Sequence, residues 1–177
     1  MSRRAIFADR DGTIIVEKGY LAHPDGVEII AGAKEALRAL KAAELVIVVV
    51  TNQSGIARGL YSSDDYHAVA SRLVEELNEA GVLLDGMYFC PHQPDSCNCR
   101  KPSTGMYLKA AEELDIDLAA SFYIGDKITD VEPGVILGGQ SILVRTGYGR
   151  KSELSIPAGV WAVEDLREAA ELIIKEA

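Results

Sequence analysis

Short apolar runs alternate along this chain with segments in which apolar residues recur at helical spacing, and this alternation restricts the possible folds strongly. Residues 45–50 form a continuous run rich in β-branched side chains, which is typical of a strand buried on both faces. Residues 33–43 instead place Ala36, Leu37 and Leu40 on one face of a helix. Strands and helices in alternation predict an α/β fold with a doubly wound, mainly parallel sheet.

The same patterns divide the rest of the chain into further strands and helices. The expected strands are 5–8, 87–90, 122–124, 141–145 and a short last strand at 160–163. The expected helices are 66–80, with an N-cap region at 63–65, then 103–114 and 165–176, and the order leaves room for a helix between the fourth and fifth strands. We expect one domain spanning residues 1–177.

Charge and apolar run length exclude several classes of protein. The chain has 18 Lys and Arg against 27 Asp and Glu, a net charge of −9, which disfavours binding to nucleic acid or to an anionic membrane. Its apolar runs fall short of the roughly 20 residues that a membrane span needs. Only residues 5–8 are apolar between Arg4 and Asp9, so we expect no secretory signal and a cytoplasmic protein.

Polar residues of particular kinds gather where the expected strands end. Residues 9–13 and 125–130 are acidic segments that follow strands, residues 51–55 offer a hydroxyl and amides, and residues 100–102 bring a basic pair to the start of a helix. Each segment alone has a plain explanation as a turn, a helix cap or a solvated charge pair. Together they occupy the carboxyl edge of a parallel sheet, where doubly wound folds bind ligands.

The chemistry of these side chains fits phosphoryl transfer. Asp9, Asp11 and Asp126 supply carboxylates of the kind that bind Mg²⁺, and Thr51 and Lys101 can hold phosphate oxygens. A carboxylate nucleophile, a metal, an anion clamp and an acid/base are the parts that such a reaction needs.

These segments, in this order, resemble the four motifs of the haloacid-dehalogenase-like (HAD) phosphatases and span most of the chain. The resemblance implies that Asp9 is the nucleophile that forms an aspartyl-phosphate, and that Asp11 acts as general acid and then as general base. It implies Mg²⁺ bound by the Asp9 carboxylate, the Asp11 backbone carbonyl and Asp126, with Asp130 farther from the ion. It also implies that Thr51 and Lys101 steady the phosphoryl group, which completes the expected catalytic set.

The intervals between the motifs are short. The segment between Thr13 and Thr51 has room for one loop and one helix, and the segment between Thr51 and Lys101 for little more than a helix and a strand. Neither interval holds a large cap domain, so we expect an open site whose selectivity comes from nearby loops.

All three cysteines of the chain lie within one short segment. Cys90, Cys97 and Cys99, together with His92, make a Cys₃His set, which is typical of a tetrahedral zinc site. Four protein ligands indicate a structural zinc in the loop at 90–102, placed to hold the two cations at its end over the phosphate. The alternative is a set of incidental cysteines beside a surface histidine.

Within the superfamily, this loop resembles that of two subgroups, the phosphatases of a heptose bisphosphate and the phosphatases of histidinol phosphate. Residues 51–59 and 17–20 look more like the heptose subgroup. The resemblance implies substrate contacts from three loops and two cations: Glu17, Lys18, Gly19, Tyr20, Thr51, Asn52, Gln53, Ser54, Arg100, Lys101 and Lys127.

The resemblance to the heptose subgroup implies hydrolysis of the C7 phosphate of a heptose 1,7-bisphosphate, and we expect a monomer that needs Mg²⁺ and Zn²⁺. Two alternatives remain open. One is a phosphatase of histidinol phosphate or of another small sugar phosphate. The other is a zinc-stabilised binding module that senses a cation or a phosphate without turnover.

Overall fold

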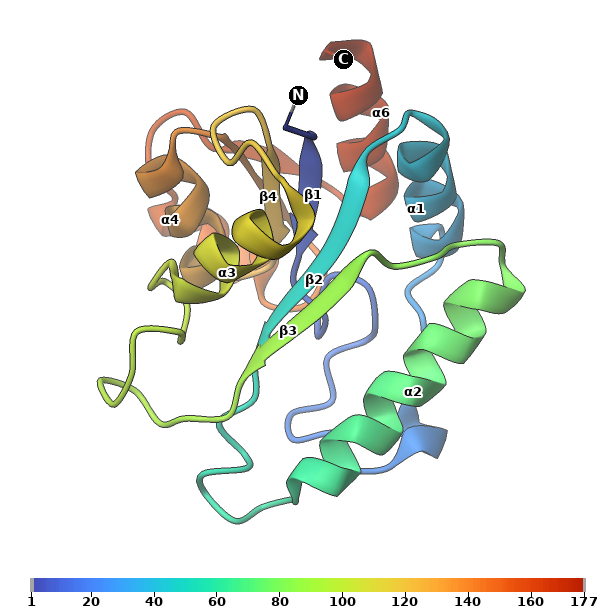
Figure 1. Cartoon of the computed structure of the whole chain (residues 1–177), viewed down its shortest axis with the longest axis vertical. Helices are drawn as coiled ribbons and strands as arrows, with labels where there is room; N and C mark the ends of the chain where they lie inside the picture. Colours follow the sequence, from blue (N-terminus) through green and yellow to red (C-terminus); the bar gives the residue numbers. More distant parts are fainter. Residues whose placement is uncertain (1, 177) are drawn as a thin grey trace.

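A computed structural model describes residues 2–176 and contains a six-stranded sheet in which every neighbouring pair is parallel (Figure 1). The predicted doubly wound, parallel sheet is confirmed. The strands are β1 (Ala5–Ala8), β2 (Val46–Asn52), β3 (Gly86–Cys90), β4 (Phe122–Gly125), β5 (Gln140–Val144) and β6 (Trp161–Val163), in the order β3-β2-β1-β4-β5-β6. The chain therefore winds outward from β1 to β3 and then returns to place β4 beside β1, which creates a topological switch point between β1 and β4.

Helices cover both faces of the sheet. They are α1 (Ala33–Ala42), α2 (Ser63–Glu79), α3 (Gly105–Leu114), α4 (Ile128–Leu137), α5 (Gly149–Ser152) and α6 (Leu166–Glu176), with single 3-10 turns at Pro24–Gly26 and Glu153–Ser155. In Figure 1, α1 and α6 lie together on one side of the sheet, and α3 and α4 lie on the other. No large cap interrupts the described residues, as the short intervals between the motifs predict.

The alternation of side chains along β1 explains why both faces need cover. Ile6 and Ala8 belong to the apolar cluster under α1 and α6, whereas Ala5 and Phe7 belong to the cluster under α3. The Phe7 ring stacks on Tyr123 with centroids 5.1 Å apart. A strand buried on both faces has no polar position, so the first charged groups after it occur at its carboxyl end.

Several boundaries differ from the sequence-based expectation by one to three residues, and two of them have a clear structural cause. Strand β2 continues through Thr51 and Asn52, because these residues pair with Phe89 and Cys90 of β3. Helix α2 begins earlier than expected, because Ser62 caps it. The Ser62 hydroxyl accepts a hydrogen bond from the Asp65 backbone N–H at 3.1 Å, and the Asp65 carboxylate accepts one from the Ser62 N–H at 2.7 Å, a reciprocal capping box.

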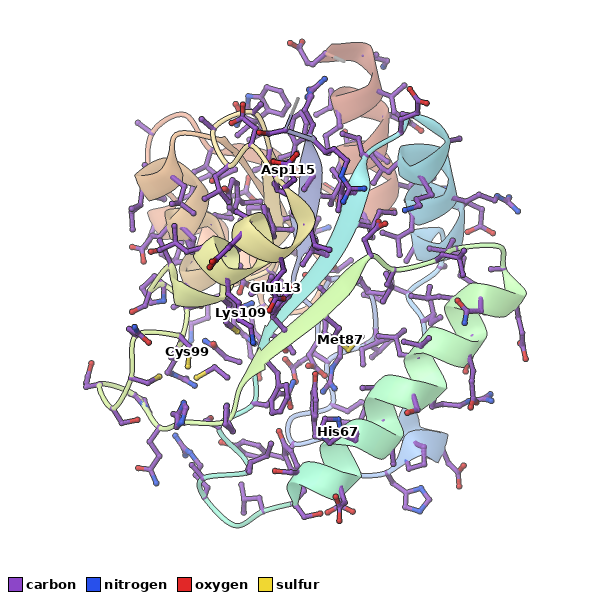
Figure 2. The ribbon with its side chains drawn as sticks, in the orientation of Figure 1. His67, Met87, Cys99, Lys109, Glu113 and Asp115 are labelled. Atoms are coloured by element: carbon purple, nitrogen blue, oxygen red, sulfur yellow. The ribbon has the colours of Figure 1, made fainter. Side chains whose placement is uncertain are left out.

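Strand β3 is one edge of the sheet, and the loop that carries the cysteines leaves from its carboxyl end. The Tyr88 hydroxyl donates to Glu113 of α3 at 2.6 Å and ties this edge to the helix. Figure 2 shows Cys99 in the loop beyond β3, and Lys109 and Glu113 on α3. Of the helices formed by residues 2–176, none is both long and apolar enough to span a membrane.

Candidate active site

A cavity of about 340 Å³ opens at the carboxyl ends of the strands. The structure brings almost all of the predicted catalytic and substrate residues to its wall: Asp9, Asp11, Glu17, Gly19, Tyr20, Thr51, Asn52, Gln53, Ser54, Arg100, Lys101 and Lys127. These residues come from four separate stretches of sequence that only the fold brings together. The cavity is therefore the candidate active site.

Lys101 joins two carboxylates at the floor of the cavity. Its ammonium lies 2.7 Å from Asp9 Oδ1 and 2.7 Å from Asp130 Oδ1, and it donates to the Val50 carbonyl at 2.6 Å. Only 2% of the lysine is exposed. Burial alone would lower the pKa of Lys101, but Asp130 and Asp9 outweigh it and hold that pKa above its ordinary value. Lys101 is thus a fixed cation beside Asp9.

Three carboxylates form a site that fits a hard cation. Asp9, Asp126 and Asp130 each offer an oxygen, and these oxygens lie within 4.8 Å of one another. Burial raises the pKa of Asp126 to about 8, and the charges of Asp9 and Asp130 add to this effect. Asp126 Oδ1 is buried and finds no hydrogen-bond partner among the described residues. A divalent cation with oxygen ligands would both balance the excess charge and satisfy that oxygen.

Asp130 lies elsewhere in the local structure than the sequence suggested. The acidic segment at 125–130 does not stay irregular to its end, because α4 begins at Ile128 and Asp130 is in the first turn of that helix. Its carboxylate accepts a hydrogen bond from the Lys127 backbone N–H at 2.9 Å. This bond caps the helix and holds Asp130 against Lys101.

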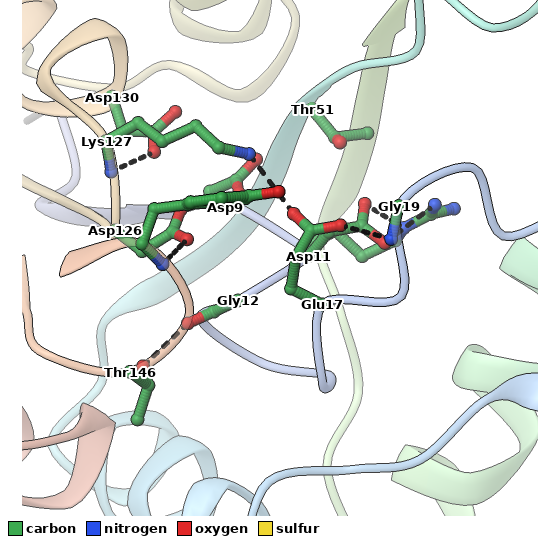
Figure 3. Close-up of polar contacts among 12 residues, drawn as sticks. Asp9, Asp11, Gly12, Glu17, Gly19, Thr51, Asp126, Lys127, Asp130 and Thr146 are labelled. Carbon is green, nitrogen blue, oxygen red and sulfur yellow. Dashed lines mark hydrogen bonds and ion pairs between the residues drawn. The ribbon is translucent and has the colours of Figure 1, made fainter. Parts of the chain in front are cut away.

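Two glycines make room for Asp126. A Cβ on Gly12 or on Gly147 would collide with the Asp126 carboxylate, and both glycines have positive φ, 86° and 54°. Asp126 Oδ2 accepts a hydrogen bond from the Tyr148 N–H at 2.8 Å, and the Thr146 hydroxyl donates to the Gly12 carbonyl at 2.6 Å (Figure 3). The turn after β1 and the turn after β5 therefore close around one carboxylate.

Asp11 is held by donors on both of its oxygens. The Arg10 guanidinium donates to Asp11 Oδ2 at 2.9 Å and to Oδ1 at 3.2 Å. The Gln53 amide donates to Asp11 Oδ2 at 3.1 Å and to the Thr51 hydroxyl oxygen at 2.9 Å. Tyr61 in turn donates to the Gln53 amide oxygen. Thr51 and Asp11, expected to act on the same phosphoryl group, thus share one hydrogen-bond donor.

The loop at 17–20 meets Lys127 across the cavity mouth. Lys127 lies 3.2 Å from Glu17 Oε2, and Glu17 Oε1 accepts from the Gly19 N–H at 2.7 Å (Figure 3). The Lys127 ammonium also lies 4.9 Å from the centroid of the Tyr148 ring. Burial alone would lower the pKa of Lys127, but Asp126, Asp9 and Glu17 hold it above its ordinary value. Lys127 is therefore a charged group at the rim.

Two predicted substrate residues have other partners in the structure. The Lys18 ammonium donates to the Gly26 carbonyl at 3.0 Å and pairs with Glu28 at 2.9 Å, and Lys18 is not part of the cavity wall formed by the described residues. The Asn52 side chain lines the cavity but bonds both the N–H and the carbonyl of Lys101, at 3.0 and 3.1 Å. Asn52 therefore holds the backbone that carries the buried ammonium.

The cysteine loop forms a compact cluster of sulfur and nitrogen atoms. The cluster consists of three sulfur atoms and one imidazole nitrogen, from Cys90, Cys97, Cys99 and His92. Its neighbouring atoms lie 3.2–3.5 Å apart, and all four lie within 4.8 Å of one another. Ligands of a tetrahedral zinc with bonds of about 2.3 Å would lie somewhat under about 4 Å apart, so the cluster has the size and the donor set for that ion. Lys101 follows Cys99 by two residues, which couples this cluster to the active site.

Sequence patterns missed several residues of the cavity. Tyr61, Thr129 and Tyr148 line it; Thr129 falls within the acidic segment at 125–130 without a role assigned to it, and the two tyrosines lie outside the motifs. The Tyr61 hydroxyl donates to the Gln53 amide oxygen and so orients that amide. Tyr148 follows the turn at 146–147 after β5, and the rule that ligands bind beyond strand ends would have pointed to it.

Comparison with known proteins gives one consistent family. A family profile described as HAD-hydrolase-like matches residues 98–169. The D-glycero-beta-D-manno-heptose-1,7-bisphosphate 7-phosphatase of Yersinia pestis is 42% identical over 96% of this chain and 94% of its own length. The enzyme of the same name from Escherichia coli K12 is 41% identical over 97% and 94%.

Solved structures agree with these relatives. A D,D-heptose 1,7-bisphosphate phosphatase from B. bronchiseptica, crystallised with magnesium and phosphate, superposes with a TM-score of 0.92 at 35% identity, over 98% of this chain and 99% of that one. The corresponding enzyme from Burkholderia thailandensis gives a TM-score of 0.77 at 30% identity, over 97% and 99%. Identity and coverage at this level establish that the chain belongs to the D-glycero-beta-D-manno-heptose-1,7-bisphosphate 7-phosphatase family of HAD phosphatases.

Proposed function

We propose that this protein hydrolyses the C7 phosphate of D-glycero-β-D-manno-heptose 1,7-bisphosphate through a phosphorylated aspartate. The observation that carries the proposal is the placement of Asp9 beside a buried ammonium and two further carboxylates, with Asp11 on the same cavity wall. A module that only binds a cation or a phosphate would not require a nucleophile and an acid in this arrangement, so the site favours catalysis over binding without turnover. The family relationship supports the same reaction.

In the first step, Asp9 attacks phosphorus. A bond forms between an Asp9 carboxylate oxygen and phosphorus while the bond from phosphorus to the C7 oxygen breaks, and Asp11 gives its proton to that departing oxygen. Lys101 and Thr51 lie on the cavity wall where phosphoryl oxygens would bind, and their donors offset the charge that a phosphate dianion brings toward a carboxylate.

In the second step, water replaces the enzyme on phosphorus. Asp11, now ionised, accepts a proton from water as the water oxygen bonds to phosphorus and the bond to Asp9 breaks. Inorganic phosphate leaves, and Asp9 and Asp11 return to their starting states. One residue acts as acid and then as base, because the proton that Asp11 gives to the departing oxygen in the first step is replaced by the proton that it accepts from water in the second.

We propose that Asp9 and Asp126 hold Mg²⁺, together with the Asp11 carbonyl, while Asp130 holds Lys101 from the other side. Bound there, the ion would neutralise phosphoryl charge that carboxylates alone would repel. The unpartnered Asp126 Oδ1 supports this assignment.

We further propose that Cys90, His92, Cys97 and Cys99 bind a structural zinc. Purified protein should contain about one zinc per chain, because four closed ligands give a tight site. Cys97→Ser should lose that zinc, unfold at lower temperature and lose activity even in saturating Mg²⁺, because the loop ends at Lys101. Metal analysis, thermal unfolding and kcat measure these effects.

The outcome that rejects the zinc assignment is full stability and activity of Cys97→Ser, or purified protein without zinc. Ser96→Ala provides the matched control, because Ser96 lies in the same loop and its hydroxyl donates only to the Gln93 carbonyl, at 2.7 Å. It should retain zinc and activity.

The second phosphate of the substrate needs cations outside the catalytic core. Arg100 lines the cavity next to Lys101, and a guanidinium can hold phosphate oxygens in a bidentate fork. We propose that Arg100 and Lys127 bind the C1 phosphate. The Glu17–Lys127 pair at the rim would then open to admit it.

This assignment predicts a strong preference between substrates. We expect kcat/KM for the heptose bisphosphate to exceed that for histidinol phosphate by about 100-fold or more, roughly 3 kcal/mol of transition-state binding. Arg100→Ala should remove much of that margin and affect a small aryl phosphate less. Arg58→Ala, an exposed arginine outside the cavity wall of the described residues, should leave the ratio unchanged.

The measurement is steady-state kinetics on both substrates for the parent and the two arginine variants. Equal or higher kcat/KM on histidinol phosphate would transfer the assignment to the histidinol-phosphate phosphatases with the same mechanism. If another sugar bisphosphate is cleaved efficiently and the heptose bisphosphate and histidinol phosphate are not, the heptose substrate is rejected and the phosphatase mechanism is retained.

We also propose that the chain acts as one domain and as a monomer, because the cavity and both candidate metal clusters are complete within one chain. Three reduced cysteines at a metal site support a reducing compartment such as the cytoplasm.

A further inference from the structure

Arg10 is a buried charge that the proposed reaction does not yet use. It lies between Asp9 and Asp11 in the sequence, only 1% of it is exposed, and among the described residues it is the largest fully buried side chain. Within residues 2–176 it takes no part in the cavity wall, so it is not placed to bind substrate. Burying a guanidinium is costly, and an apolar side chain of similar volume would serve stability as well or better.

The guanidinium of Arg10 has one charged partner in the described part of the chain, and that partner is Asp11. The contact is a fork, with Nε on Oδ2 at 2.9 Å and Nη2 on Oδ1 at 3.2 Å. On its other side the guanidinium carbon lies 5.6 Å from the centroid of the buried Tyr66 ring of α2. The fork is thus backed by a rigid aromatic ring.

The backbone of Arg10 is also fixed. Its carbonyl accepts hydrogen bonds from the Ile14 and Ile15 N–H groups, at 3.0 Å each. Both isoleucines are fully buried in the apolar core. Main chain and side chain of Arg10 are therefore set by the fold before any substrate arrives.

Gln53 completes the set of donors. Its amide nitrogen bonds Asp11 Oδ2 at 3.1 Å, and its amide oxygen accepts from Tyr61, so the amide is held with its donor toward the carboxylate. Burial raises the pKa of Tyr61 to about 12, which keeps the hydroxyl protonated and able to donate. Among the described residues, Asp11 Oδ2 therefore has two donors, while Oδ1 has only the longer contact from Arg10.

We propose that Arg10 is a positioning residue for Asp11, and that its fork on Asp11, together with the Gln53 donor, leaves Oδ1 as the oxygen that exchanges the proton. Oδ2 is engaged by two donors, so Oδ1 keeps lone-pair capacity for the departing sugar oxygen and then for water. The inference rests on the proposed role of Asp11 as acid and base.

The test compares two leaving groups and two half-reactions. An aryl phosphate has a good leaving group and needs little proton donation to form the phosphoenzyme, whereas the sugar phosphate needs it. Both substrates need a base for hydrolysis of the phosphoenzyme. For Arg10→Met we expect kcat on the heptose bisphosphate to fall about 10²-fold, with KM changed less than about threefold.

In a single turnover with excess enzyme, Arg10→Met should release the aryl alcohol within about threefold of the parent rate, while its phosphoenzyme decays about 10²-fold more slowly. Arg10→Lys keeps the charge without the fork and should recover only part of the loss. Arg10→Lys also carries the test if the methionine variant fails to fold.

Arg145→Met is the matched control. Arg145 makes a comparable fork with Glu153, at 2.8 and 2.6 Å, beyond the end of β5, and it should affect neither half-reaction. The inference fails if the Arg10 variants slow aryl release as much as sugar cleavage, if they change KM alone, or if they match the parent.

Asp11→Asn, measured in the same assays, distinguishes a failure of the acid/base role of Asp11 from a failure of the positioning role of Arg10. If Asp11→Asn keeps full activity on the sugar substrate, the proposed role of Asp11 fails. If Asp11→Asn loses activity while the Arg10 variants do not, only the positioning role fails.

Discussion

Asp9→Asn should lower kcat at least about 10³-fold, on the heptose bisphosphate and on an aryl phosphate alike. An amide neither attacks phosphorus nor binds a hard cation well, and the need for a nucleophile does not depend on the leaving group. Steady-state kinetics on both substrates measure the loss. A chemical trap for the phosphoenzyme should find it in the parent and not in the variant.

The folded state of Asp9→Asn should survive the change, because the substitution removes one of the charges that crowd Asp126 and Asp130. Both of those carboxyls have raised pKa values, through burial first and through Asp9 next. Thermal unfolding without added metal should therefore show no large loss of stability. Near-normal turnover by Asp9→Asn would reject the covalent mechanism.

Lys101→Met should lower kcat by about 10² to 10³-fold, because it removes a donor aimed at the transferring phosphoryl group. It should also reduce the free energy of unfolding of the metal-free protein by roughly 3–5 kcal/mol, because it breaks a buried ion pair and leaves the carboxylates uncompensated. Asp9 and Asp130 each lie 2.7 Å from the ammonium that is lost. Kinetics and chemical denaturation with and without Mg²⁺ measure the two effects.

Added Mg²⁺ should restore part of the stability of Lys101→Met and little of its activity, because the ion balances charge but does not replace the donor. Lys109→Met is the control, since the Lys109 side chain on α3 is 64% exposed and pairs with Glu113 only at 3.9 Å. It should change the free energy of unfolding by less than about 0.5 kcal/mol. A stable and active Lys101→Met would contradict the role assigned to this lysine.

The sheet and the acidic end of the site were predictable from short-range patterns. A short, continuous apolar run such as β2 is typical of a strand buried on both faces, so its secondary structure can be predicted from its residues. The polar side chains that follow such a strand then lie at the carboxyl edge of the sheet. Asp9 and Asp126 directly follow β1 and β4, so this rule predicts their position at the sheet edge, whereas Lys101 precedes α3 and reaches Asp9 through the loop after β3. The end of β2 was less predictable, because Thr51 belongs to the strand only through its pairing with Phe89.

Side chains that act through tertiary contacts left no such pattern. From the sequence, Arg10 would be expected to be an exposed arginine in a turn. Its burial and its fork on Asp11 arise from tertiary contacts with Tyr66 and Asp11. Tyr61 lies in a loop without periodicity, so its bond to Gln53 follows from the path of that loop. Such roles depend on distances between segments that local sequence does not encode.

The two glycines that enclose Asp126 have a consequence for how this enzyme tolerates mutation. Gly12 and Gly147 lie in turns 135 residues apart, yet any side chain at either position would occupy the volume of the same carboxylate. A methyl group at either position would push the Asp126 carboxylate away from the cation site. Alanine at either position should therefore affect metal binding as the loss of Asp126 would, and not only strain the turn. The position of one proposed cation ligand, Asp126, thus depends on side-chain atoms that must stay absent at two positions outside the proposed ligand set.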